Sequence, residues 1–216
     1  MNDQPTNKPC SCCGSSEKLD SGNWQSRYVA GETGWDRGEP SPALLHWLEN
    51  GDLTPCRILV PGCGRGHEVV ELASRAFEVT AVDFADAPVQ ELARSLAENN
   101  LVAEVLQEDI LNFASSERFD AIYEQTCLCA IDPGHRTAYE ERLANHVKFG
   151  GKLFALFMQS GKGKDGPPFP CYIDEMKRLF DESRWLWPEK QLPVDHPAGL
   201  QEIAVVLQRR DPNCKR

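Results

Sequence analysis

The sequence lacks a long apolar segment and an excess of basic residues, and each absence excludes a class of partner. No stretch approaches the roughly 18 to 20 consecutive apolar residues that span a membrane. Lys and Arg number 23 against 33 Asp and Glu, which gives a formal net charge of −10. Because basic side chains provide most of the affinity for nucleic acids and for anionic membranes, we expect neither as a partner.

A recognisable targeting segment is also missing. The first ten residues contain neither the basic start nor the apolar stretch of a secretory signal, so we expect a cytoplasmic protein. Residues 1–20 have almost no apolar content, which predicts a disordered leader. The remaining residues, 21–216, have the length of a single domain.

Disulfide-rich and metal-centred architectures are not indicated. The nine cysteines are odd in number and spread along the chain, which favours reduced thiols. Cys10-x-x-Cys13 has a spacing found in zinc sites, but a structural zinc site needs four ligands, and no convincing second pair follows. We predict no metal site, and the role of Cys10, Cys12 and Cys13 stays open.

What the sequence does contain is an alternation of strand-like and helix-like segments. Each expected strand is nearly all apolar, as in strands that are buried on both faces of a parallel sheet. The alternation predicts an α/β fold with a mainly parallel sheet covered by helices on both sides. Strands are expected at 57–61, 78–83, 103–107, 119–123, 152–158, 184–187 and 202–208, and helices from 42, at 66–76, 88–99, 136–148 and 173–180.

Candidate binding residues follow the first three expected strands. Gly62, Gly64 and Gly66 follow the first, where glycines allow a sharp turn and a close approach to a ligand. Asp83 ends the second strand, where a carboxylate can accept both hydroxyls of a ribose, and its alternative role is to cap the next helix. Asp109 and Ile110 follow the third strand. Asp109 can accept a hydrogen bond from the exocyclic amine of adenine, and Ile110 can pack against the face of the adenine ring. The G-x-G-x-G spacing and the acidic surroundings favour S-adenosylmethionine over a dinucleotide, whose pyrophosphate gains nothing from carboxylates.

Four ordered motifs then resemble one known family. They are Trp24-x-x-x-Tyr28-x-x-Gly31-x-Thr33-Gly34-Trp35, Val60-Pro61-Gly62-Cys63-Gly64-x-Gly66-His67, Cys127-x-Cys129-Ala130-Ile131-x-Pro133-x-x-Arg136 and Gly166-Pro167-Pro168-Phe169. Together they resemble the thiopurine S-methyltransferase superfamily, and residues 123–131 are similar to its branch of small thiol and halide methyltransferases. The resemblance implies a Rossmann-like sheet of seven strands, parallel except for the last.

The resemblance also implies a set of cofactor-binding residues. Aromatic residues of the N-terminal segment close over the cofactor in this family, and cation–π attraction to a sulfonium gives a physical reason. The positions that match the family's cofactor site are Trp24, Tyr28, Trp35, Gly62, Asp83, Asp109, Ile110 and Gln125. The aromatic residues have a purely structural alternative, in which they fix the N-terminal segment to the core.

Gln125 departs from the thiopurine enzymes, which carry an arginine at this position of the substrate site. A neutral amide lacks the charged donor fork of a guanidinium, so we expect a smaller acceptor: a thiol, hydrosulfide, selenol or halide. Substrate candidates are Gln125, Phe169 and Arg136, although Arg136 could equally be a solvated helix residue. Because methyl transfer from a sulfonium depends mainly on positioning, no side chain is assigned as catalytic.

Several alternatives remain open at this stage. The acceptor could be a metalloid oxyanion such as tellurite or selenite. The chain could also be a nicotinamide-dependent oxidoreductase or a cofactor-binding module without catalysis. The expected partner is a small-molecule acceptor, and the expected state is a monomer or a weak homodimer.

Overall fold

The computed structural model describes residues 19–160, 163, 166–196 and 199–212. Most of the predicted leader, including Cys10, Cys12 and Cys13, lies outside the described residues. Its last residue, Asp20, caps the helix that begins at Ser21, because its side chain accepts a hydrogen bond from the backbone N–H of Asn23 at 3.0 Å. Such a bond satisfies one of the donors that a helix N-terminus leaves unpaired.

Helices and strands alternate through most of the described chain. The helices are α1 (Ser21–Ala30), α2 (Pro42–Glu49), α3 (His67–Ser74), α4 (Asp86–Glu98), α5 (Arg136–His146), α6 (Ile173–Leu179) and the short 3-10 helix η1 (Pro133–His135). The strands are β1 (Arg57–Pro61), β2 (Glu78–Asp83), β3 (Glu104–Gln107), β4 (Phe119–Gln125), β5 (Val147–Met158), β6 (Trp185–Leu186), β7 (Leu192–Asp195) and β8 (Gln201–Arg209).

The strands form one sheet of eight in the order β3-β2-β1-β4-β5-β8-β6, with β7 paired to β8 outside this path. The pairs among β1 to β5 are all parallel. β8 is antiparallel to β5, with partners that run from Lys152 opposite Gln208 to Met158 opposite Glu202. The order reverses at β1, which has β2 on one side and β4 on the other.

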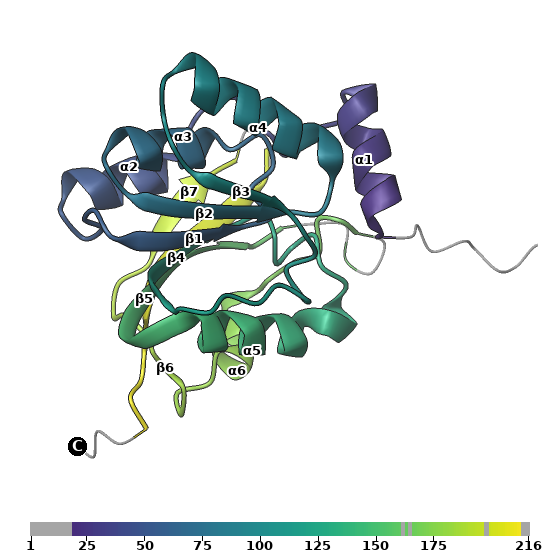
Figure 1. The fold of residues 1–216 in the computed structure, drawn as a ribbon. Coiled ribbons are helices and arrows are strands. Elements are labelled where there is room, and N and C mark those ends of the chain that lie inside the picture. Colours follow the sequence, from purple (N-terminus) through teal and green to yellow (C-terminus); the bar gives the residue numbers. More distant parts are fainter. Residues whose placement is uncertain (1–18, 161–162, 164–165, 197–198, 213–216) are drawn as a thin grey trace, which may run out of the picture.

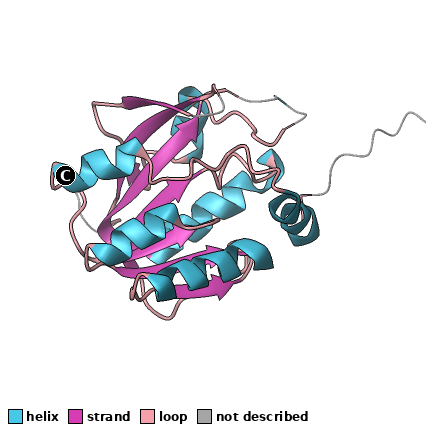
Figure 2. Cartoon of the chain, turned by 90° about the horizontal axis from the view of Figure 1, so that it is seen from above, coloured by secondary structure: helices cyan, strands magenta, loops and turns pink. Residues whose placement is uncertain are grey.

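Helices cover both faces of this sheet (Figure 1). α2, α3 and α4 pack on one face through buried residues such as Leu44, Leu72 and Leu92. α5 and α6 pack on the other face through Leu143 and Met176. Seen from above, the helices lie over the twisted strands (Figure 2). α1 lies next to one end of α4, beside the carboxyl ends of the strands (Figure 1).

The predicted Rossmann-like α/β fold with an antiparallel last strand is confirmed, whereas individual elements differ; α1, for example, was not among the expected helices. The sheet has eight strands instead of seven, because the short strand β7 adds to β8. The helix expected at 136–148 ends at His146, and β5 begins directly afterwards at Val147. Among the described residues, every helix is too short or too polar to span a bilayer.

Candidate functional site

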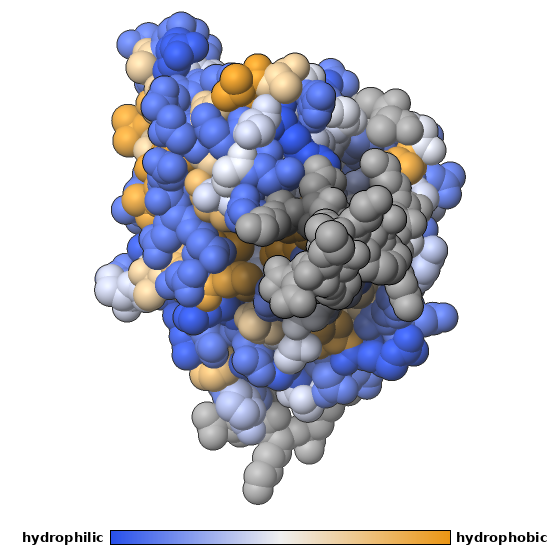
Figure 3. Space-filling model, turned by 90° about the vertical axis from the view of Figure 1, so that its right-hand side faces the viewer, coloured by the Kyte–Doolittle hydropathy of each residue, from blue (hydrophilic) through white to orange (hydrophobic). Residues whose placement is uncertain are grey.

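A cavity opens at the carboxyl ends of β1 and β4, where the strand order reverses. Crevices at such reversal points are the usual ligand sites of open parallel sheets. Gly62 follows β1 directly, and Gln125 is the last residue of β4. The cavity of about 70 Å³ is lined by Tyr28, Trp35, Asp36, Arg37, Glu39, Val60, Pro61, Gly62, Cys63, Gly64, Arg65, Gly66, His67, Glu68, Tyr123, Gln125 and Thr126. Figure 3 looks onto this side of the molecule and shows apolar surface near its centre within a hydrophilic border.

The glycine turn after β1 requires glycine on two grounds. Gly62, Gly64 and Gly66 all have positive φ values of 58°, 52° and 72°, a region that other L-residues rarely adopt. A Cβ on Gly62 would lie 2.7 Å from the Cys127 sulfur, and one on Gly64 would lie 2.9 Å from the Tyr28 hydroxyl oxygen. The turn therefore passes directly beneath the side chains that close the site.

Asp83 lies behind this turn at the end of β2. Its two carboxylate oxygens accept hydrogen bonds from the backbone N–H groups of Gly64 (2.9 Å) and Ala85 (3.0 Å). Burial raises the pKa of the carboxyl, whereas these backbone donors act in the opposite direction. The carboxylate thus shapes both the glycine turn and the loop before α4. Two oxygens offer about four acceptor directions, so two ribose hydroxyls could still bind.

Three aromatic residues of the N-terminal segment form a cluster over the turn. The ring centroids of Trp24 and Trp35 are 5.2 Å apart, and those of Tyr28 and Trp35 are 5.6 Å apart, both with edge-to-face geometry. Tyr28 is buried, and burial raises the pKa of its hydroxyl well above the ordinary value. Tyr28 and Trp35 line the cavity. Trp24 is not among the lining residues, but its ring packs against that of Trp35.

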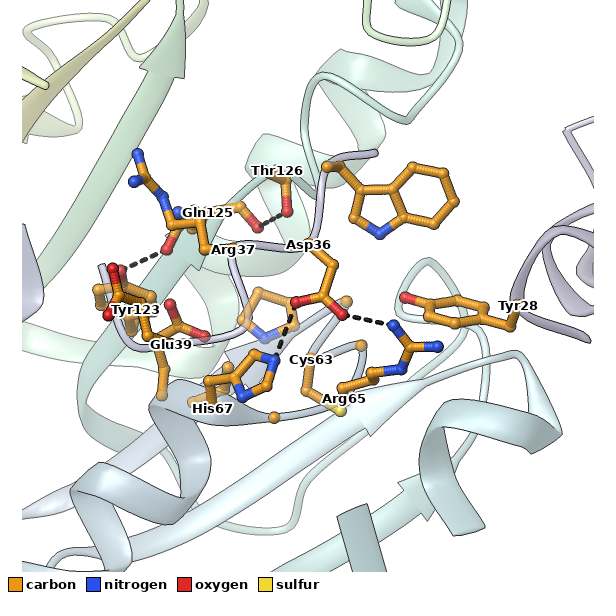
Figure 4. Close-up of a pocket in the computed structure, with 17 residues that line it drawn as sticks. Tyr28, Asp36, Arg37, Glu39, Cys63, Arg65, His67, Tyr123, Gln125 and Thr126 are labelled. Atoms are coloured by element: carbon orange, nitrogen blue, oxygen red, sulfur yellow. Dashed lines mark hydrogen bonds and ion pairs between the residues drawn. The ribbon is translucent and has the colours of Figure 1, made fainter. Parts of the chain in front are cut away.

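Asp36, next to Trp35, binds the N-terminal segment to the glycine turn (Figure 4). One of its oxygens accepts from the guanidinium of Arg65 at 2.6 Å, and the other lies 2.9 Å from His67 Nε2. Arg65 also donates to Glu91 on α4 at 2.6 Å. Hydrogen bonds from His67 and Arg65 hold the pKa of Asp36 well below its usual range, and the bond to Asp36 raises the pKa of His67. We call Asp36, Arg65 and His67 the Asp36 latch.

At the other end of the cavity, Gln125 is held by its neighbour on the same face of β4. The hydroxyl of Tyr123 donates to Gln125 Oε1 at 2.6 Å (Figure 4). Thr126, the next residue, has a φ of 58° and donates from its side chain to the carbonyl of Gln125 at 2.8 Å. Positive φ is a genuine outlier for a β-branched residue, and such outliers concentrate at functional sites.

The other predicted residues lie outside the lining of this cavity. Asp109 forms a turn in which its carboxylate accepts from the backbone of Leu111 at 2.9 Å, and the neighbouring Ile110 is buried in the core. Arg136 is buried rather than solvated, and it donates to the carbonyls of Phe169 (3.3 Å) and Pro170 (3.0 Å). In this structure Arg136 therefore positions the 166–171 segment. Direct contacts of Arg136 and Phe169 with an acceptor stay predictions.

Two buried carboxyls near the site had no signal in the sequence. Burial raises the pKa of Glu124 to about 8 and that of Glu202 to about 7. Glu124 accepts from the backbone N–H of Leu128 at 2.7 Å, and its second oxygen is buried without a hydrogen-bond partner among the described residues. Glu202 lies 3.4 Å from the guanidinium of Arg37.

The structure thus brings together Tyr28, Trp35, Gly62 and Gln125 from the predicted set. Sequence reasoning missed Asp36, Arg37, Tyr123 and Thr126, which line the same cavity. Only Asp36 and Arg37 had a local signal, because they directly follow the Trp24–Trp35 motif. Tyr123 lies in an apolar strand, where its sequence context predicts only an ordinary core residue.

The fold matches a known class of enzyme structures. The chain superposes on 1,6-didemethyltoxoflavin N1-methyltransferase of Burkholderia thailandensis, solved with S-adenosylhomocysteine, with a TM-score of 0.74 and 18% identity, covering 96% of this chain and 94% of the other. The chain thus has the fold of S-adenosylmethionine-dependent methyltransferase structures, with a glycine turn after β1 and an acidic residue at the end of β2.

Sequence comparison defines the family within this class. Residues 19–196 match the thiopurine S-methyltransferase family. A probable thiol methyltransferase 2 of Arabidopsis thaliana is 34% identical over 162 residues, 74% of this chain and 72% of the relative. Thiocyanate methyltransferase 1 of Brassica oleracea is 30% identical over 159 residues, 73% of this chain and 70% of the relative. The chain belongs to the thiopurine S-methyltransferase family, and its cofactor is S-adenosylmethionine.

The residues present fit this cofactor. The glycine turn lies between the Tyr28 ring and the Asp83 carboxylate, so closely packed that a Cβ at Gly64 would collide with the Tyr28 hydroxyl. A cationic sulfonium suits this surrounding of rings and carboxylates, and no cluster of phosphate-binding basic side chains is needed. When bound, the cofactor supplies an activated methyl group on a good leaving group.

Proposed function

We propose that the protein transfers the methyl group of S-adenosylmethionine to a small soft nucleophile, with thiols and hydrosulfide as first candidates and selenols and halides as further ones. The neutral amide of Gln125, which lines the cavity, carries this proposal. The names of the thiol and thiocyanate methyltransferase relatives support the same acceptor class.

In the proposed arrangement the two ends of the cavity have different roles. Gly62, Asp83 and the aromatic cluster would hold the cofactor, as predicted for Trp24, Tyr28 and Trp35, with Asp109 and Ile110 at the adenine end. Gln125 and Phe169 would contact the acceptor, and Arg136 would support them through the backbone of the 166–171 segment. The Asp36 latch would keep the aromatic cluster closed and exclude water.

No dedicated base is needed for such acceptors. A halide has no proton to lose, and a thiol with a pKa of about 8.5 is a few per cent thiolate at neutral pH. Holding the acceptor, methyl carbon and sulfur in line can lower the barrier by about 7–11 kcal/mol. We also propose a cytoplasmic protein that works as a monomer or weak homodimer. The net charge of −10 supports the further proposal that it has no nucleic acid or membrane partner.

An acceptor panel tests the proposal. Purified protein is incubated with S-adenosylmethionine and hydrosulfide, an alkyl thiol, iodide, thiocyanate, selenite, tellurite or a thiopurine, and S-adenosylhomocysteine formation is measured. We expect the highest kcat/KM with a small sulfur nucleophile. Turnover of tellurite alone would favour the metalloid alternative, and a preference for the thiopurine would contradict the assignment to a small acceptor.

Calorimetric titration separates the remaining alternatives. We expect S-adenosylmethionine and S-adenosylhomocysteine to bind and NAD not to bind. Tight binding of NAD without binding of the methyl donor would overturn the proposed function, and cofactor binding without turnover of any acceptor would identify a non-catalytic module.

A further inference from the structure

The turn after β4 is held from inside by the buried carboxyl of Glu124. Side chains alternate along a strand, so Glu124 lies on the Ile122 face of β4, which α5 covers, and on the opposite face from Tyr123. The side chain is 1% exposed, and its Oε1 accepts a hydrogen bond from the backbone N–H of Leu128 at 2.7 Å. Leu128 is also 1% exposed, so its N–H depends on this carboxyl rather than on water. Glu124 therefore determines where the chain turns after the strand.

This turn joins the two residues that are proposed to contact the acceptor. Gln125 precedes the turn, and the carbonyl of Cys129, within it, accepts from the backbone N–H of Phe169 at 2.7 Å. The Cys129 thiol donates to the carbonyl of Thr126 at 3.2 Å, and Thr126 has a positive φ of 58°. A β-branched residue rarely adopts this conformation by itself, so contacts from outside the turn must maintain it. The hydrogen bond to Glu124 is such a contact.

Arg136 is the second group that holds this wall of the site. It donates to the carbonyls of Phe169 at 3.3 Å and Pro170 at 3.0 Å. Its Nε and the Oε2 of Glu124 are both buried, and neither has a hydrogen-bond partner among the described residues. Burial raises the pKa of Glu124 to about 8, while the Arg136 charge acts in the opposite direction. Glu124 is therefore mostly protonated at neutral pH, and its ionisation would draw Arg136 away from the two carbonyls.

We propose that Glu124 is a positioning residue of the acceptor site, which fixes the 126–131 turn and, through Cys129, the place of Phe169. This inference rests on the proposed function and adds to it a residue that lies outside the cavity lining and needs no contact with either substrate. Methyl transfer depends on a collinear arrangement, in which a misplacement of about 1 Å can cost about 100-fold in rate. A wall that is fixed by a buried hydrogen bond keeps a small acceptor in that arrangement.

Steady-state kinetics with hydrosulfide and S-adenosylmethionine at pH 7 test this role. Glu124→Ala leaves the Leu128 N–H buried without an acceptor, so we expect the KM for hydrosulfide to rise about tenfold. The KM for S-adenosylmethionine should change less than about threefold, because Asp83 holds the glycine turn through a separate hydrogen bond. A change confined to the acceptor KM separates positioning from a general loosening of the fold.

Two further variants serve as controls. Glu124→Gln keeps a carbonyl oxygen for the Leu128 N–H and an N–H group in place of the O–H, so it should restore both KM values at pH 7. Glu117→Ala, at an exposed glutamate just before the same strand, is the matched control and should leave both KM values unchanged.

The pH dependence gives a readout that a merely structural role would not change. The hydrosulfide KM of the unaltered protein is divided by that of Glu124→Gln, so that the ionisation of the acceptor cancels. We expect this ratio to be near one at about pH 6.5 and to rise severalfold by about pH 9.5, as Glu124 ionises and Arg136 leaves the 166–171 segment. The other groups that face Glu124 are present in both proteins and cancel in the same way. They are Glu202 on β8, Arg136 and Tyr139 on α5, and the thiols of Cys127, Cys129 and Cys171.

The outcomes separate the two proposals. A hydrosulfide KM within about threefold of the unaltered value in folded Glu124→Ala, or equal rises in both KM values, would overturn the positioning role and leave the methyltransferase assignment intact. If Glu124→Ala loses its cooperative thermal transition, the pH ratio decides, and a constant ratio would overturn the role. If the unaltered protein prefers another acceptor of the panel, the same measurements are made with that acceptor. Failure of the unaltered protein to methylate any of them would overturn the proposed function, and this inference with it.

Discussion

Replacing Gly62 by alanine should destabilise the protein by about 2–5 kcal/mol. A non-glycine residue at positive φ, here 58°, costs about 1–2 kcal/mol. The new Cβ would also lie 2.7 Å from the sulfur and 2.8 Å from the Cβ of Cys127. Neither atom belongs to a flexible chain end, so the backbone of the turn or of the Cys127 segment must shift, and overpacking of this kind costs about 1–3 kcal/mol more.

Gly38→Ala is the matched control for this substitution. Gly38 also has a positive φ, 73°, but a Cβ there would meet no atom within 4 Å. Urea unfolding of both variants should show a loss of about 1–2 kcal/mol for Gly38→Ala and a larger loss for Gly62→Ala, since only the second adds the steric contact. In a chain of this size each kcal/mol corresponds to a fall in Tm of about 2–4 °C.

Equal stability losses in the two variants would refute the reasoning, because the contact with Cys127 would then have no energetic effect. A Cys127→Gly substitution gives an independent check. It removes both atoms that the new Cβ would meet, so the additional cost of Gly62→Ala should disappear in the double variant.

Three further predictions concern charged groups. Asp83→Ala should weaken S-adenosylmethionine binding by about 1.5–3 kcal/mol in calorimetry, the usual value for a charged hydrogen bond, and an unchanged Kd would remove Asp83 from the site. Burial raises the pKa of Glu124 to about 8. The folded state thus binds more protons than the unfolded state between about pH 4.5 and 8, and stability falls as pH rises through this window. Glu124→Gln should flatten that decline in urea unfolding at pH 5 to 9, and an unchanged slope would argue against a protonated carboxyl. The hydrogen bond to Asp36 raises the pKa of His67, so this pair stabilises the fold at low pH and loses its effect as pH rises through the raised value. Asp36→Asn should lower the pKa of His67 in an NMR titration, and an identical titration curve would exclude the Asp36 latch.

Much of the sheet could be predicted because its buried strands are continuous apolar runs between helical patterns. The start of β5 was missed because Phe149, Gly150 and Gly151 interrupt the apolar pattern, and pairing with β4 overrides this weak local preference. β7 was missed for a different reason. Its four residues are mostly exposed and include Pro193, so only the hydrogen bonds to β8 define it as a strand.

The site residues also fall into two groups, those that local motifs predict and those that depend on the tertiary fold. Gly62, Tyr28, Trp35 and Gln125 belong to local motifs, so their place in the cavity could be predicted. The contacts of Asp36 could not, because its partner Arg65 is 29 residues away and the pairing depends on where the N-terminal segment folds back.

The position of β8 has a consequence for the synthesis of the protein. β8 follows β6 and β7 in the chain, yet it lies between them and β5. On the ribosome, β5 therefore emerges well before the strand that covers its edge, and its residues Lys152–Met158 keep backbone groups unpaired in the interval. An open apolar strand edge promotes association between chains. The nascent chain should therefore depend on chaperones until Gln201–Arg209 has left the exit tunnel, and premature termination before that segment should give aggregates rather than a partly active domain.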